Sequence, residues 1–101
     1  MDQQLFSGVG NIIRNEALYR AGIHPLSITG KIPAAKINRL IKEVVTYSQL
    51  FYQQLKTTGN PEEFSVYRQE YAADGSHVTM KILPKSKRKI FFSEHRQRLY
   101  Q

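Results

Sequence analysis

The stretch Gly8-Val9-Gly10-Asn11 has the residue types of an anion site. Glycine lets a backbone approach a ligand closely, and asparagine is a strong helix N-cap. An apolar pattern with helical spacing begins at Ile12, so we expect a helix that opens from a glycine loop. Because helix N-terminal amides attract negative charge, this stretch predicts a phosphate site formed by Gly8, Gly10 and Asn11. A plain tight turn before a capped helix is the alternative interpretation.

A second candidate lies near the C-terminus, where basic residues gather between two short apolar runs. Alternation of apolar residues and a Pro-Lys turn predict an antiparallel hairpin over residues 77–94. Its turn carries Lys85, Lys87, Arg88 and Lys89. The planar, permanently charged guanidinium of Arg88 suits phosphate contacts and insertion into a groove, with the lysines supplying further attraction. The alternative is a solvated basic turn that discourages pairing between sheet edges.

The first 25 residues resemble the helix–two-turns–helix module of the formamidopyrimidine-DNA glycosylase/endonuclease VIII family. The matching positions are Asp2-Gln3, Gly8-x-Gly10-Asn11, Asn15-Glu16 and Arg20-Ala21-Gly22-Ile23-His24-Pro25. The resemblance implies a DNA-binding module in which Asn11 contacts phosphate. We expect Glu16 to hydrogen-bond the backbone of the glycine loop and His24 to serve the turn rather than catalysis.

The C-terminal residues resemble the zinc finger that follows this module in many members of the family. Val66-Tyr67 matches the lead-in, Gln97 matches a glutamine after the last cysteine, and Arg88 lies near the arginine that contacts DNA. Because the hairpin is shorter here, Lys87 or Lys89 could take the place of Arg88. This resemblance places the chain near the endonuclease VIII-like branch.

The four cysteine positions of that finger are occupied by Asp74, His77, Ser93 and Arg96. A structural zinc site needs four ligands, usually thiolate or imidazole, and the whole sequence has no cysteine. Together with His95, these positions could supply at most three mixed ligands beside an arginine. We therefore expect no metal and no cofactor, and a zincless finger. Its expected apolar contacts are Val78, Met80, Ile82, Ile90, Phe91 and Phe92.

Two helices and a hairpin must position these residues. The first helix is expected over residues 12–21, with Gly22 just past its end and Pro25 preventing continuation. Pro33 suits the first turn of a long second helix, which ends near residues 57–59 and is followed by a linker at Asn60-Pro61. The expected fold is mainly α with a small β-hairpin: a helix–two-turns–helix module over residues 1–60 and a zincless finger over residues 61–101.

Composition and charge favour a polyanionic partner. The 101 residues include 15 Lys and Arg against 8 Asp and Glu, which gives a formal net charge of +7. Such an excess indicates nucleic acid before a membrane surface. There is no apolar run of transmembrane length and no secretory signal pattern, and the lack of cysteine fits a reducing compartment. We expect a soluble intracellular protein.

The resemblance also implies what this chain lacks. In the family, an N-terminal proline amine and the adjacent glutamate carry out glycosylase and lyase chemistry, whereas this chain begins Met1-Asp2-Gln3. We therefore expect it to be inactive alone and to bind damaged or abasic double-stranded DNA within base excision repair. A catalytic N-terminal domain, in cis or in trans, is the expected protein partner. The alternatives are an RNA-binding helix–two-turns–helix protein of ribosomal type and a degenerate structural domain.

Overall fold

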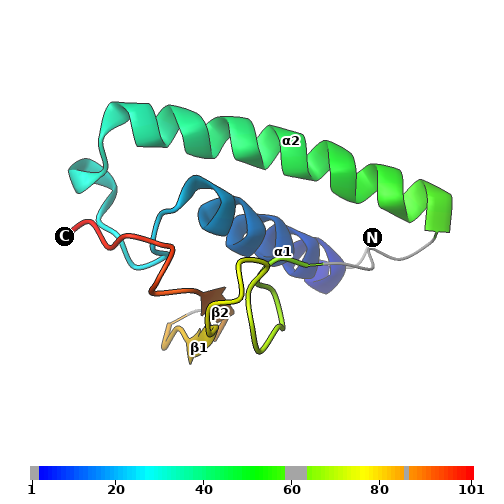
Figure 1. Ribbon diagram of the computed structural model, residues 1–101. Coiled ribbons are helices and arrows are strands. Elements are labelled where there is room, and N and C mark those ends of the chain that lie inside the picture. Colours follow the sequence, from blue (N-terminus) through cyan, green and yellow to red (C-terminus); the bar gives the residue numbers. More distant parts are fainter. Residues whose placement is uncertain (1–2, 59–63, 86) are drawn as a thin grey trace.

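The computed structural model describes residues 3–58, 64–85 and 87–101. Its elements in chain order are helix α1 (Gln3–Ala21), the 3-10 turn η1 (Thr29–Lys31), helix α2 (Ala34–Thr58) and strands β1 (Thr79–Ile82) and β2 (Lys89–Phe92). Figure 1 shows α2 on one side of α1 and the small sheet on the other. The expected combination of helices with one small hairpin is confirmed, and the expected linker at Asn60-Pro61 lies outside the described residues.

Helix α1 is continuous from Gln3 to Ala21. The expected loop at residues 8–10 and the expected N-cap at Asn11 are therefore wrong, because all of them lie within the helix. A glycine lowers helix stability by only about 1 kcal/mol relative to alanine, so two separated glycines need not end a helix. The amides of Gly8, Gly10 and Asn11 belong to the repeating backbone hydrogen bonds of α1 and do not form an open helix N-terminus.

Helix α1 ends at Ala21, directly before Gly22, as the sequence predicts. Gly22 has φ +74°, a left-handed conformation that glycine adopts without a steric penalty. Its N–H donates to Tyr19 O at 3.1 Å, and Ile23 N–H donates to Leu18 O at 3.0 Å. This pair of bonds is a Schellman motif, which satisfies carbonyls that the helix end would leave unpaired.

Helix α2 begins directly after Pro33, as predicted, and packs against α1 through an apolar stripe. Tyr47 and Phe51 are buried, and the Arg20 guanidinium lies 4.9 Å from the centre of the Tyr47 ring. Other apolar residues of α2 are exposed, among them Ile41, Val44, Val45 and Tyr52. In the part of the chain that the structure describes, neither helix combines the length and the apolarity needed to cross a bilayer.

Strands β1 and β2 form the predicted antiparallel hairpin, with Thr79 opposite Phe92 and Ile82 opposite Lys89. The two strands contribute unequally to packing. Ile90, Phe91 and Phe92 are all buried in β2, whereas Met80 and Ile82 are 48% and 55% exposed. The expected packing by Met80 and Ile82 is therefore wrong, because only β2 lies against the body of the molecule.

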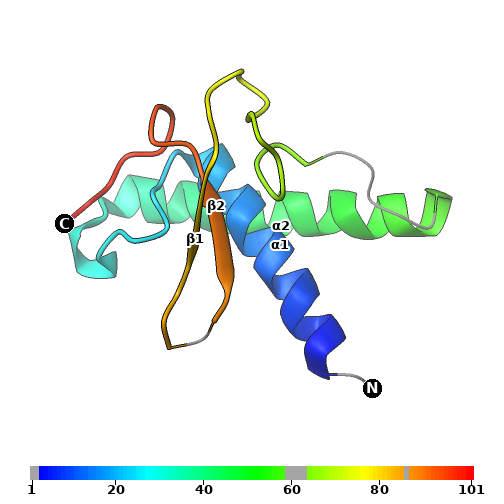
Figure 2. The ribbon, with the colours of Figure 1, turned by 90° about the horizontal axis from the view of Figure 1, so that it is seen from below.

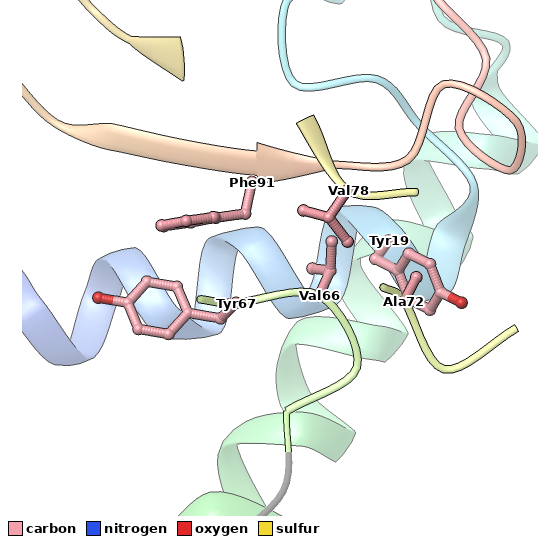
Figure 3. Packing of buried hydrophobic residues seen from close by; sticks show 6 residues of the cluster. All are labelled: Tyr19, Val66, Tyr67, Ala72, Val78 and Phe91. Atoms are coloured by element: carbon pink, nitrogen blue, oxygen red, sulfur yellow. The ribbon is translucent and has the colours of Figure 1, made fainter. Parts of the chain in front are cut away.

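The loop between α2 and β1 completes the core. Tyr19 of α1 packs with Val66, Tyr67, Ala72, Val78 and Phe91, which come from this loop and from β2 (Figure 3). The loop has an isolated bridge between Tyr71 and His77 around a tight turn, where Gly75 has φ +87°. Helix α1 and the finger-like part thus share one core.

Candidate nucleic-acid interface

Two asparagines of α1 fasten strand β2 to the helix. Asn11 Nδ2 donates to Lys89 O at 3.0 Å, and Asn15 Oδ1 accepts the N–H of Phe91 at 2.7 Å. Asn15 Nδ2 also donates to Asn11 O at 2.8 Å, which fixes the orientation of its amide. Both side chains are buried. The start of β2, and with it the hairpin turn, is therefore held beside residues 11–15 of α1.

This role differs from the one expected for Asn11. Its side-chain donor is used within the molecule and does not cap the helix. Within the described part of the chain, its Oδ1 is buried and has no hydrogen-bond partner. Because the amides of this turn lie inside α1, a phosphate cradle of main-chain amides at a helix mouth is ruled out for residues 8–11.

The hairpin turn is basic and compact. Leu83 N–H donates to Arg88 O at 2.9 Å and Lys87 N–H donates to Leu83 O at 2.8 Å, with Lys87 at φ +56°. Lys85, Lys87 and Lys89 are exposed, while Arg88 is half-buried. In Figure 2 this turn and the N-terminal half of α1 project to the same side of α2. The bond from Asn11 to Lys89 O places the start of β2, just after this turn, beside the glycine-containing part of α1.

Arg14 belongs to the same surface and was missed in the sequence analysis. It is exposed on α1, and its pKa is lowered by partial burial and by the nearby charge of Arg88. It also lines an open hollow between α1 and α2 together with Gly10, Leu18 and Leu40. The signal was present in the sequence, since residues 10 and 14 share one helix face.

Glu16 orders a loop, although a different one from the loop that the sequence analysis predicted. Its side chain is fully buried and accepts three main-chain N–H groups: Oε1 from Ser65 at 2.6 Å, and Oε2 from Val66 at 2.8 Å and Tyr67 at 3.1 Å. Hydrogen bonds from main-chain N–H groups to a carboxylate are among the stronger hydrogen bonds in proteins. Glu16 thereby fixes the chain that leads from the second helix to the hairpin.

The base of the hairpin is joined by side-chain hydrogen bonds. Ser76 Oγ bonds both Asp74 Oδ1 and Ser93 Oγ, each at 2.5 Å, and hydrogen bonds from Ser76 lower the pKa of Asp74. Arg96 N–H donates to Ser93 Oγ at 3.3 Å. Among the residues that the structure describes, no group of three or more His, Asp or Glu side chains is placed to hold a metal ion. Asp74, Ser93 and Arg96, which occupy three of the four cysteine positions of the finger, take part in this network.

Arg96 also connects the hairpin base to α1. Its Nε donates to Tyr19 O at 2.9 Å, its Nη2 donates to Arg20 O at 3.2 Å, and its guanidinium lies 4.6 Å from the centre of the Tyr19 ring. These carbonyls belong to the last turn of α1, where a positive charge is favourable. Gln97 adds a buried link, because its side chain accepts Ser93 N–H and donates to Ile23 O, both at 2.8 Å.

His24 supports the turn after α1, as expected. It is buried, its Nδ1 accepts Leu26 N–H at 3.0 Å, and its ring centre lies 4.2 Å from that of Phe92. Burial lowers the pKa of His24, an effect that Glu94 opposes and Lys81 reinforces. The neutral imidazole is the form that this hydrogen bond requires.

A known family model and known proteins match the sequence of this chain. The family model described as the formamidopyrimidine-DNA glycosylase H2TH domain matches residues 1–58. The chain belongs to the formamidopyrimidine-DNA glycosylase/endonuclease VIII family. It is 47% identical over 78 residues to Endonuclease 8-like 2 of Homo sapiens, which covers 77% of this chain and 23% of that protein. The chain thus spans about a quarter of the length of this relative.

Two solved structures of glycosylases resemble the fold. A viral DNA glycosylase aligns with a TM-score of 0.77 and 25% identity, over 97% of this chain and 37% of that one. MutM, in a complex with DNA containing carbocyclic 8-oxo-G, aligns with a TM-score of 0.70 and 21% identity, over 88% of this chain and 35% of that one. The arrangement of α1, α2 and the hairpin is thus shared with glycosylases of this family.

Proposed function

We propose that this chain is the DNA-binding part of an endonuclease VIII-like DNA glycosylase/AP lyase of base excision repair. The ligand is double-stranded DNA with a damaged or abasic nucleotide. The observation that carries this proposal is that α1 and the basic hairpin turn lie side by side, joined by the Asn11 and Asn15 bonds to β2. The presence of DNA in the MutM complex supports it.

The proposed organisation is a helix–two-turns–helix module over residues 1–60 followed by a zincless finger over residues 61–101. The match of the H2TH domain model to residues 1–58 supports the first part. The network around Ser93 and the bonds of Arg96 to α1 support the second, because they hold the hairpin base without a metal ligand set.

The proposed DNA contacts come from the hairpin turn and from α1. Arg88 binds a phosphate, and Lys85, Lys87 and Lys89 attract the backbone electrostatically. The sugar–phosphate backbone passes along α1 at Gly8, Gly10 and Asn11, where the two glycines carry no side chain that would hold it away. In support, a Cβ added at Gly10 would have no heavy atom within 4 Å. Glu16 contributes indirectly, by ordering the loop before the hairpin.

Catalysis belongs to another part of a longer protein in this proposal. The chain covers only 23% of Endonuclease 8-like 2, so most of that relative has no counterpart here. The exposed apolar residues of α2, including Ile41 and Val45, offer a surface against which a catalytic domain would dock in cis or in trans. By itself the chain is expected to bind DNA without cleaving it.

The test is fluorescence anisotropy with a labelled duplex that contains an abasic-site analogue, titrated over a range of salt concentrations. With ~4–6 phosphate contacts, affinity should fall by about one to three decades between low and physiological salt. A fourfold variant with glutamine at residues 85, 87, 88 and 89 should lose most of this dependence. Binding without a salt slope contradicts the proposal, and tighter binding to structured RNA of equal charge favours the RNA-binding alternative.

A further inference from the structure

We infer that the outer edge of strand β1 binds an extended peptide segment of a partner protein, which pairs with β1 in antiparallel orientation as a third strand of the sheet. The segment that fits has one carboxylate side chain between two apolar side chains, and these three face Lys81, Met80 and Ile82. The inference goes beyond the proposed binding of DNA and does not depend on it.

The main-chain groups of Met80 and Ile82 point away from β2. Phe91 N–H and Lys89 O are bonded to asparagine side chains of α1, so these two residues of β2 direct their main-chain groups away from β1. In the antiparallel pair, Met80 lies opposite Phe91 and Ile82 lies opposite Lys89. Residues opposite each other in such a pair either exchange both hydrogen bonds or both point outward. The N–H and C=O groups of Met80 and Ile82 therefore face the outer edge of β1.

This edge is open in the part of the chain that the structure describes, where the sheet has two strands only. Figure 2 shows β2 between β1 and α1, so the outer edge of β1 faces away from the first helix. The residues of β1 from Met80 to Ile82 are all exposed. An edge with unpaired N–H and C=O groups is a template on which another extended chain can pair.

The chain itself begins such a pairing and then leaves it. Val78, just before β1, donates its N–H to Glu70 O at 3.0 Å beside an antiparallel bridge of the same loop. Two residues before Glu70, Arg68 has φ +57°, a left-handed conformation that is incompatible with an extended strand. The loop thus covers the edge only as far as Val78. Met80 and Ile82 remain uncovered, in line for a partner that continues in the same antiparallel orientation.

One face of β1 selects apolar residues in the partner. Because residues two apart in a strand share a face, Val78, Met80 and Ile82 lie on the same side. Val78 is part of the buried core cluster, whereas Met80 and Ile82 are 48% and 55% exposed. Apolar side chains directly opposite Met80 and Ile82 would cover both and extend the core outward.

Charge favours an acidic partner over a second copy of this chain. Lys81 is exposed on the other face of β1, and its Nζ lies 5.9 Å from the centre of the Phe92 ring. Opposite charges directly across two strands stabilise the pair, and like charges destabilise it. A second copy paired over residues 80–82 would place Lys81 opposite itself, and the formal net charge of +7 on each chain adds to the repulsion. A carboxylate opposite Lys81 is the complementary group.

The first test is fluorescence anisotropy with a labelled synthetic peptide that has Val-Glu-Val at its centre and Gly and Ser on both sides. Lys81→Glu should weaken binding of this peptide about fivefold and should bind a matching Val-Lys-Val peptide more tightly instead. Lys42→Glu makes the same change of charge at an exposed position of α2 and should leave the ratio of the two affinities unchanged. Equal effects of the two substitutions would show a general attraction between charges and would overturn the inference.

N-methylation of the peptide tests the main-chain pairing without changing any charge. In the antiparallel arrangement both Val N–H groups face β1, whereas the Glu N–H faces away. Methylation of both Val nitrogens should weaken binding about tenfold, and methylation of the Glu nitrogen should change it by less than about twofold. Bound peptide should also slow hydrogen exchange at the amides of Met80 and Ile82 more than at those of Thr79 and Lys81, which face β2. Equal losses from the two methylations, or unchanged exchange at Met80 and Ile82, would contradict the pairing.

Sedimentation equilibrium of the chain without peptide tests the other occupant of the edge. We expect a monomer, whereas a dimer that Met80→Pro abolishes would show that a second copy occupies the edge, and the inference would be wrong. Met80→Pro removes an N–H that faces outward, and proline is tolerated on edge strands. In the folded variant, as checked by circular dichroism, binding of the Val-Glu-Val peptide should be lost. Retained binding would place the peptide elsewhere and overturn the inference.

Discussion

Asn15 and Phe91 are 76 positions apart in the sequence, yet Asn15 Oδ1 accepts the main-chain N–H of Phe91 at 2.7 Å in the interior. This bond and the Asn11–Lys89 bond fix the basic hairpin turn beside α1. The surface proposed to contact DNA therefore depends on two buried amide side chains that need not touch DNA themselves.

Replacing Asn15 should therefore affect both stability and binding. Asn15→Ala leaves the buried N–H of Phe91 without an acceptor and is expected to lower the free energy of unfolding by about 1–3 kcal/mol. Urea unfolding followed by circular dichroism measures this change. Asn38→Ala, at an exposed position of α2, is the control and should change stability by less than about 0.5 kcal/mol. Equal stability of the two variants would show that the Asn15 bond does not hold the hairpin.

Glu16→Gln should destabilise the loop that leads to the hairpin. The amide keeps the size of the side chain but replaces one acceptor oxygen with an NH2 group that faces main-chain N–H donors. We expect a loss of about 2–3 kcal/mol in the free energy of unfolding, since bonds to charged groups are stronger than neutral ones. Glu43→Gln, which removes a surface ion pair with Arg39, should cost less than about 1 kcal/mol. A smaller loss for Glu16→Gln than for Glu43→Gln would contradict the role of Glu16.

Several features of the helices and the hairpin could be predicted from local sequence signals. The left-handed φ of Gly22, the start of α2 after Pro33 and the hairpin at residues 77–94 all follow from residue types and spacing. The local preference of the two glycines favours a loop at residues 8–11, yet these residues are helical. Their helical structure adds to the interior hydrogen bonds of α1, which outweigh a modest propensity cost.

Long-range partners could not be predicted in this way. Nothing near Asn11 in the sequence indicates that its side chain binds the carbonyl of Lys89, 78 positions away. Likewise, nothing near Glu16 in the sequence indicates that its carboxylate accepts main-chain N–H groups about 50 positions later. A buried carboxylate or amide needs partners, but the sequence does not show which part of the chain supplies them.

The base of the hairpin, proposed to be part of a zincless finger, gives a third prediction. Arg96→Met removes two hydrogen bonds to α1 carbonyls and the contact with the Tyr19 ring, and should cost about 1–2 kcal/mol of stability. Arg98→Met, which removes a contact with the Tyr100 ring, is the matched control with an expected cost below about 1 kcal/mol. Excess EDTA should leave the melting temperature of the protein unchanged. A fall in melting temperature that zinc reverses would overturn the zincless finger.

The pH dependence of stability tests the role of His24. Burial lowers its pKa in the folded protein, while the unfolded chain has a value of about 6.5. The folded state therefore binds this proton less readily than the unfolded state. Its contribution to stability is complete above the unfolded pKa and is lost as the pH falls toward the folded value. Protonation would also remove the acceptor that Nδ1 offers to Leu26 N–H.

Urea unfolding between about pH 7.5 and about pH 5 should show a falling free energy of unfolding. In His24→Gln this fall should be smaller, because position 24 no longer titrates, whatever the absolute stability of the variant. If His24→Gln and the starting protein lose stability in parallel, another group governs the transition, and a neutral His24 is not what holds the turn after α1.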